Sequence, residues 1–239
     1  MLSFDLDIFV GSWYLFHKWY NKHTKTGINM NFQAILPQLK GLPYITKNNL
    51  KLFQDKSDDA FNANIKRWMK KGWLIKLKNG FYVTKEYIEK ENDKEAYNEF
   101  IATQLIFPSY LTKEYILQKF NVLAEFTYGY TLVTTRKTNF VQNNLSYYSY
   151  SFIKKDLFCG YIKKKYKQNI FFIATKAKAL FDFIYFKKRF LKEVNTETVE
   201  GLRLDPDSFT DDDFIEFEKY LEIAGSPKME RIYRLLKED

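Results

Sequence analysis

Between Phe61 and Gly80 the chain carries six basic side chains and no acidic one. They are Lys66, Arg67, Lys70, Lys71, Lys76 and Lys78. Lysine and arginine bind phosphate groups, and arginine and asparagine can also form paired hydrogen bonds with base edges. This segment therefore indicates binding to a polyanion, and nucleic acid has the chemistry that fits it.

Helical periodicity explains how part of this segment is displayed. The pattern predicts a helix over residues 58–71, with Ser57 as its N-cap and Gly72 as the glycine that ends it. Residues placed about 100° apart separate into an apolar face and a polar, basic face. The apolar face holds Phe61, Ile65, Trp68 and Met69, and the other holds Asn62, Ala63, Lys66, Arg67 and Lys70.

A predicted hairpin follows the helix. Apolar strands over 73–77 and 81–83 flank Asn79-Gly80, which favours a type I′ turn because both central positions of that turn need positive φ. Lys76 and Lys78 then lie on the hairpin. Two short helical stretches before residue 58, one of them preceded by Thr46, complete a predicted winged helix-turn-helix over residues 31–90.

The expected ligand of this domain is double-stranded operator DNA. In a winged helix-turn-helix the second helix enters the major groove and the hairpin lies against the adjacent backbone. We expect base or groove contacts from Asn62, Lys66 and Arg67, with Ala63 allowing close approach. Phosphate contacts are expected from Lys70, Lys76 and Lys78.

The rest of the chain predicts a second domain over residues 97–239, of mixed α/β type, so the fold class is α+β with two domains. Residues 85–96 predict a solvated helix or linker. Strands are expected over 128–135, 145–153, 157–162 and 169–175, and helices after Thr112 and Thr175 as caps. Lys178 and Asp182 are four apart on the later helix, which favours a partly buried structural ion pair over a catalytic one.

Composition limits the class of protein. With 239 residues, 46% of them hydrophobic, the chain can bury one large core or two modest ones, and its net charge of +9 favours an acidic partner. The single cysteine, Cys159, excludes an internal disulfide. Histidines occur only at 17 and 23, and no phosphate-binding glycine loop is found, so we expect no catalytic residue, cofactor or metal.

Residues 1–30 form an uncertain leader, which we expect to be a helix packed on the first domain. Asp5 and Asp7 stand where a signal peptide carries positive charge. The apolar run after them is about half the length needed to cross a bilayer. We therefore expect an unsecreted, cytoplasmic protein with no membrane partner.

Several blocks of the chain, in order, resemble those of the AbiEi-type antitoxins. They are KKGWLIKLKNGFYV at 70–83, FPSYL at 107–111, TLVTTRKT at 131–138, LFCGY at 157–161 and ATKAKALFD at 174–182. The resemblance covers about residues 42–190. It implies a winged-helix domain that represses its own operon and an α/β domain that counteracts a nucleotidyltransferase toxin. This arrangement is called type IV, in which a stable toxin–antitoxin complex is not required.

The same resemblance gives candidate antitoxicity residues, namely Arg136, Lys137, Lys178 and Asp182. One departure bears on that activity. Members of the family usually carry Pro-Glu where this chain has Lys176-Ala177. If that glutamate contributes to antitoxicity, a regulator without antitoxin activity gains weight.

The alternative hypotheses are a stand-alone winged-helix regulator and a protein-interaction module. Basic patches at 163–165 and 187–189 motivate the second, because DNA readout by the first domain does not explain them. The operator sequence, the oligomeric state and the toxin stay open at this point.

Overall fold

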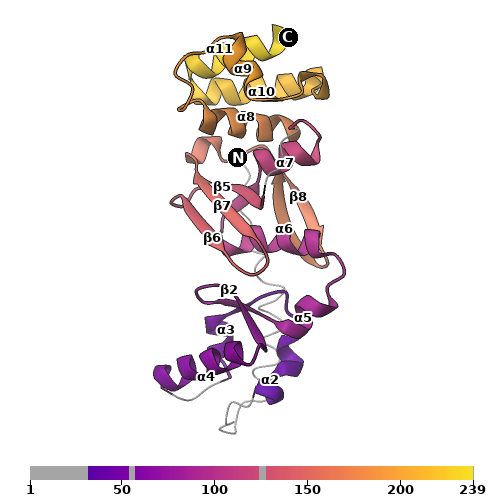
Figure 1. The fold of residues 1–239 in the computed structure, drawn as a ribbon, viewed down its shortest axis with the longest axis vertical. Coiled ribbons are helices and arrows are strands. Elements are labelled where there is room, and N and C mark those ends of the chain that lie inside the picture. The colour runs from indigo at the N-terminus through magenta and orange to yellow at the C-terminus, as the bar shows by residue number, and fades with distance from the viewer. Residues whose placement is uncertain (1–31, 54–56, 124–127, 239) are drawn as a thin grey trace. The chain divides into compact units, whose positions relative to one another are not determined.

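The structure, a computed structural model, describes residues 32–53, 57–123 and 128–238. It is a mixed α+β fold with helices and two β-sheets (Figure 1). The chain divides into two compact units, the first formed by residues 1–76 and 80–90 and the second by residues 77–79 and 91–239. The predicted leader, residues 1–30, lies outside the described residues. Within the described part, no helix is long and apolar enough to cross a membrane.

The first unit combines short helices with a three-stranded sheet of order β1-β3-β2. Its elements are α2 (Phe32–Leu39), β1 (Ile45–Thr46), α3 (Lys47–Lys51), α4 (Asp58–Lys70), β2 (Leu74–Lys78), β3 (Phe81–Thr84) and α5 (Lys85–Lys90). Thr46 caps α3 through a capping box with Asn49. One apolar core joins them: Phe32, Ile35, Leu39, Ile45, Leu50, Phe61, Ile65, Trp68, Leu74 and Tyr82.

Helix α4 begins and ends where the sequence predicts. Ser57 Oγ accepts from the Ala60 amide, which satisfies one of the donors left open in the first turn. At the other end, Gly72 has φ of 72°. The Gly72 amide donates to Met69 O and the Trp73 amide to Trp68 O, the two bonds of a Schellman motif. The chain therefore leaves α4 in a defined direction and enters β2.

The turn between β2 and β3 differs from the type I′ turn that we expected. Gly80 has φ of 80°, but Asn79 is not among the residues with positive φ. A glycine at the second central position is enough to close a two-residue connection of another type, so asparagine keeps an ordinary backbone conformation. The hairpin is also joined to α3, because the Lys47 amide donates to Gly80 O at 2.7 Å.

The second unit contains a six-stranded sheet of order β6-β7-β5-β4-β9-β8. Its elements are α6 (Lys94–Leu105), β4 (Ser109–Leu111), α7 (Glu114–Lys119), β5 (Tyr130–Thr134), β6 (Asn139–Gln142), β7 (Tyr147–Phe152), η2 (Lys155–Leu157), β8 (Tyr161–Tyr166), β9 (Asn169–Ala174), α8 (Lys176–Lys187), α9 (Thr196–Glu200), η3 (Pro206–Ser208), α10 (Asp211–Ala224) and α11 (Pro227–Glu238). β4 is parallel to β9 and β5 to β7, and the other pairs are antiparallel.

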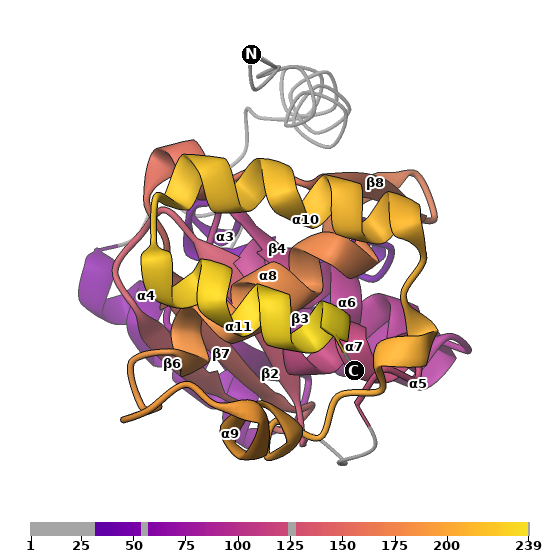
Figure 2. The ribbon, with the colours of Figure 1, turned by 90° about the horizontal axis from the view of Figure 1, so that it is seen from above.

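Helices pack on this sheet and on one another. Helix α6 contacts β4, β5, β8 and β9, while α8 contacts β9, α7 and α10. Figure 2 shows α10 and α11 as neighbouring helices. Their contact includes the stacked rings of Phe217 and Tyr233, with centroids 5.2 Å apart. The apolar stretch over 176–187 is consequently covered on several sides, in agreement with its nearly continuous hydrophobic character.

Some elements of the second unit differ from the expectation. Strand β4 is only three residues long and buried throughout, so it shows no alternation and was not predicted. Strand β6 is mostly exposed and lacks the pattern of a half-buried strand. The predicted strand at 157–162 instead runs over Tyr161–Tyr166, through three lysines. Thr112 is not the cap of α7; Lys113 takes that position with φ of 56° and no side-chain cap bond.

Residues 85–96, where we expected a solvated helix or linker, begin with α5 and are mostly exposed, but two of their side chains are buried. Tyr87 of α5 and Glu91 are both buried. Glu91 accepts hydrogen bonds from the Tyr166 hydroxyl and from Lys167 Nζ, which is 2.5 Å away. Burial raises the pKa of Glu91, but these bonds from Lys167 and Tyr166 outweigh it and leave the pKa below its ordinary value.

The two edges of the six-stranded sheet have different chemistry. β8 presents Lys163, Lys164 and Lys165, which are all exposed and which we call the lysine edge. At the opposite edge, β6 has no charged residue, and Phe140 is 56% exposed. Lysine on an edge strand discourages pairing with the strand of another molecule.

Candidate nucleic-acid interface

The polar side of α4 is a continuous exposed surface. Ala63, Lys66, Arg67 and Lys70 are all exposed, and we call them the basic face of α4. The carboxylates of this helix are confined to its first turn, where Asp58 and Asp59 lie near the positive end of the helix dipole. Asp58 also forms an ion pair with Lys51 at 2.9 Å. The positive charge of the basic face is thus left available to an external anion.

Core packing fixes the direction in which the basic face points. Phe61, Ile65 and Trp68 alternate with the basic residues at helical spacing and are buried. The Trp68 ring lies 5.1 Å from the ring of Phe32, which belongs to α2. Burial of an aromatic or aliphatic side chain contributes about 1.5–3 kcal/mol, so rotation of α4 about its axis would lose several such terms.

The hairpin next to α4 contributes one exposed cation. Lys76 on β2 is exposed, and at the end of α4 the ammonium of Lys71 lies 4.5 Å from the Trp73 ring centroid. Lys78 is different. It is half-buried, its ammonium donates to Leu105 O within the second unit, and burial lowers its pKa. Lys78 therefore has a protein acceptor in the place of the expected phosphate.

The two asparagines of α4 differ in their burial and contacts. Asn62 is half-buried beside the basic face. Asn64, which the sequence reasoning did not select, accepts a hydrogen bond at Oδ1 from Arg67 Nη2 at 2.8 Å. The spacing of three residues, at which side chains of a helix are neighbours, was the signal that could have identified it.

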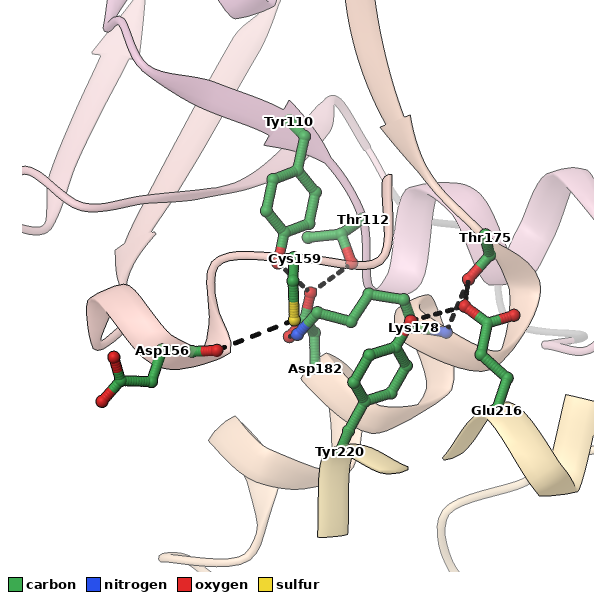
Figure 3. Close-up of polar contacts among 9 residues, drawn as sticks. All are labelled: Tyr110, Thr112, Asp156, Cys159, Thr175, Lys178, Asp182, Glu216 and Tyr220. Carbon is green, nitrogen blue, oxygen red and sulfur yellow. Dashed lines mark hydrogen bonds and ion pairs between the residues drawn. The ribbon is translucent and has the colours of Figure 1, made fainter. Parts of the chain in front are cut away.

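In the second unit, Lys178 and Asp182 form the expected ion pair, and both side chains are 0% exposed. Lys178 Nζ lies 2.5 Å from Asp182 Oδ1 (Figure 3). Asp182 Oδ2 accepts from the hydroxyls of Tyr110 at 2.9 Å and Thr112 at 2.8 Å. Thr112, which we expected to be a helix cap, instead donates a hydrogen bond to the buried carboxylate. Burial, with the charge of Asp182, raises the pKa of the Tyr110 hydroxyl well above its ordinary value, so this donor keeps its proton.

Three segments pack closely around the pair, namely α8 itself, α10 and the loop at Gly160. The Lys178 ammonium lies 4.6 Å from the Phe181 ring centroid and 5.1 Å from that of Tyr220 on α10. Gly160 has φ of 70°, and a Cβ there would lie 2.1 Å from the Tyr220 hydroxyl and 2.9 Å from Lys178 Cγ. Only glycine fits this position. The complete shielding of both charges identifies the pair as a structural element, since neither side chain can reach a partner while α8 keeps its place.

The start of α8 is bound to α10 by a second set of contacts. Thr175 caps α8 and its hydroxyl donates to Glu216 Oε1 at 2.6 Å; the Tyr220 hydroxyl donates to the same oxygen. Lys176 forms an ion pair with Asp213 at 2.6 Å. Ala177 is fully buried. Lys176 therefore connects two helices, and Ala177 is part of the core.

Cys159 lies next to Gly160 but has no reactive setting. It is half-buried, and its thiol lies 3.8 Å from the carbonyl oxygen of Asp156. Burial raises its pKa, which reduces the thiolate fraction at neutral pH.

The remaining antitoxicity candidates lie elsewhere in the unit. Arg136 and Lys137 follow β5 and are exposed. Arg136 Nε donates to Phe107 O at 3.4 Å, and Lys137 lines an open pocket with Thr135, Thr138 and Phe152. Because Lys178 and Asp182 are buried, the four predicted residues do not form one surface.

Comparison with known proteins finds no family model that matches the chain and no match among curated proteins, so the resemblance to AbiEi-type antitoxins stays a prediction.

Proposed function

We propose that residues 31–90 form a winged helix-turn-helix domain that binds double-stranded operator DNA. Helix α4 enters the major groove through its basic face, and the β2–β3 hairpin lies along the adjacent backbone. The observation that carries this proposal is the division of α4. The basic residues of α4 and Ala63 are exposed on one side of the helix. Phe61, Ile65 and Trp68 on the other side are buried in the core.

In this proposal Lys66 and Arg67 lie nearest the bases and Lys70, Lys71 and Lys76 meet phosphates. The assignment differs from the sequence expectation at three positions. Asn62 is left out of the base contacts because it is half-buried. Lys71 joins the set because it is exposed, and Lys78 is left out because it already donates to Leu105 O.

The cellular role that we propose is that of a cytoplasmic autorepressor and antitoxin of a type IV system, acting against a nucleotidyltransferase toxin without a stable complex. The ordered blocks between residues 70 and 182 support it by their resemblance to AbiEi-type antitoxins. The alternative, a regulator without antitoxin activity, is supported by Lys176 and Ala177, which stand where the resembled family usually carries Pro-Glu.

The test of DNA binding is a gel shift with the chain's own promoter fragment. Lys66→Ala/Arg67→Ala should abolish retention of the fragment. The matched control is Lys219→Ala/Arg231→Ala, which removes the same two charges from exposed positions of α10 and α11 and should retain it. Equal retention by both variants would overturn the proposal.

Salt dependence gives an independent check. Each phosphate neutralised by the protein releases counterions, so the logarithm of the binding constant should fall by about 0.9 per contacted phosphate for each unit of log salt concentration. Removal of Lys76 should reduce this slope by about one. A complex that does not respond to salt would require another binding mode.

The antitoxin role can be separated from repression by expressing the full chain from a foreign promoter. If protection against the toxin resides in the second unit, the Lys66→Ala/Arg67→Ala variant should still protect cells. Arg136→Ala/Lys137→Ala in the same background should then lose protection, since both side chains are exposed. Protection lost with the α4 variant alone would identify repression as the protective act.

A further inference from the structure

The guanidinium of Arg67 is held by a neighbour on the same helix. Asn64 lies one turn before it, and its Oδ1 accepts from Arg67 Nη2 at 2.8 Å. Side chains on a helix already lean toward the N-terminus of the helix. The bond reinforces that lean, so the guanidinium is carried toward the first half of α4 before any ligand is present.

The bond to Asn64 leaves most of the guanidinium available. Arginine has five N–H donors in a planar fork, and Asn64 accepts from one of them. The fork matches a pair of acceptors, such as O6 and N7 of guanine in the major groove. The N-terminal half of a recognition helix is the part that contacts base edges. A phosphate contact requires no such orientation, because a phosphate attracts the charge from many directions.

The lysines of the basic face differ from Arg67 in kind. Lys66 and Lys70 carry compact ammonium groups on flexible stems, which act as point charges and lack a planar pair of donors. Arg67 combines a planar fork with an orienting neighbour. We propose that Arg67, oriented by Asn64, is the specificity-determining residue of the interface and recognises a guanine in the major groove. This inference rests on the proposed DNA-binding function.

The experiment begins with selection of preferred duplexes from a random pool by the full-length chain, followed by competition binding at every base pair of the selected site. The wild type should show one G·C pair whose replacement weakens binding strongly. Arg67→Lys keeps the charge but removes the fork. Its preference for that pair should fall about 10- to 100-fold, while affinity for random duplex stays close to that of the wild type.

Two further variants distinguish orientation from charge. Asn64→Ala introduces a better helix former at a site outside the core, so the helix should form, and the preference for the same pair should fall about 3- to 10-fold. Lys76→Ala, the control, should weaken binding to all duplexes alike and leave the preference intact.

The outcomes separate the two proposals. If the wild type selects no sequence and binds no duplex in a salt-dependent way, the DNA-binding function fails and this inference with it. If the wild type binds a defined site, but Arg67→Lys and Asn64→Ala retain its base preference, DNA binding stands and the inference about Arg67 is overturned.

Discussion

The basic face of α4 and the buried pair of α8 use the same kind of side chain in opposite surroundings. On α4, Lys66, Arg67 and Lys70 face solvent and lie away from the helix carboxylates. On α8, the Lys178 ammonium is fully buried and bonded to Asp182, whose other oxygen has two hydroxyl donors. A cation whose charge is not paired with a carboxylate is available to a ligand, and a buried cation with a complete set of partners organises the fold.

Solvation is the physical basis of this difference. An exposed ammonium keeps its water and contributes little to folding, so its position can be chosen for binding. A buried ammonium loses its water and is tolerated only with a close carboxylate and further hydrogen bonds. Substitutions in the two regions should therefore have opposite consequences, which the following predictions use in decreasing order of their effect on stability.

Asp182→Ala should have the largest effect. It leaves Lys178 charged and buried without its carboxylate, and the expected loss in the free energy of unfolding is about 3–5 kcal/mol. Urea unfolding followed by near-ultraviolet circular dichroism of the tyrosines measures it. Trp68 and Trp73 belong to the first unit and give a separate fluorescence signal for it.

The double variant Lys178→Met/Asp182→Leu is the control for that prediction. It removes both charges and keeps apolar volume, so it should cost less than Asp182→Ala. If Asp182→Ala costs under about 1 kcal/mol, the pair does not have the structural role assigned to it.

Gly160→Ala should have the next largest effect. The new methyl group would meet the Tyr220 hydroxyl at 2.1 Å, and the backbone at φ of 70° disfavours any residue with a Cβ. We expect a loss of about 2–4 kcal/mol from overpacking and left-handed strain together. Thermal unfolding measures it. Gly41→Ala is a suitable comparison, because nothing lies within 4 Å of a Cβ there and its φ is not in the left-handed region; equal losses for both would contradict the account.

Glu91→Gln should have a moderate, pH-dependent effect. The pKa of Glu91 is lowered in the folded chain, so its charge adds stability above the ordinary pKa of a glutamate, and this contribution is lost as pH falls through the folded-state pKa. At pH 7 the variant should be about 1–2 kcal/mol less stable than the wild type. The two stability curves should converge below about pH 4. If the two stability curves stay parallel over the whole pH range, the charge of Glu91 is not the cause of the stability difference.

Lys66→Ala/Arg67→Ala should have the smallest effect on stability and the largest on binding. Both side chains are exposed, and alanine favours a helix, so the free energy of unfolding should change by less than about 0.5 kcal/mol. The same preparation should fail to retain the promoter fragment. If this variant were clearly destabilised, the exposed cations of α4 would have a structural role like that of the buried pair, which would contradict the proposed function.

The first unit could be predicted closely because its signals are local. Ser57, Gly72 and the helical spacing of Phe61, Ile65 and Trp68 each determine a feature of α4 by themselves. The hairpin could also be predicted from local residues. Its turn type could not, because Gly80 alone has a positive φ. Asn64 was missed since its role depends on a rotamer of Arg67, which composition does not specify.

The second unit could be predicted less well because its elements depend on distant neighbours. The Lys178–Asp182 pair followed from spacing on one helix, but its complete burial comes from Tyr110 on β4, Thr112 just after it and Tyr220 on α10. Strand β4 has three residues and gives no periodic signal. Its place in the centre of the sheet arises from pairing with β5 and β9, which lie far away in sequence.

The lysine edge has a practical consequence for purified protein. Lys163, Lys164 and Lys165 keep β8 from pairing with another molecule mainly through charge repulsion. Added salt shortens the range of that repulsion to about 3 Å at 1 M. A high-salt buffer during purification therefore weakens the protection of this edge against sheet-to-sheet aggregation. Dilute protein, returned promptly to moderate ionic strength, should stay dispersed where a concentrated high-salt stock becomes turbid.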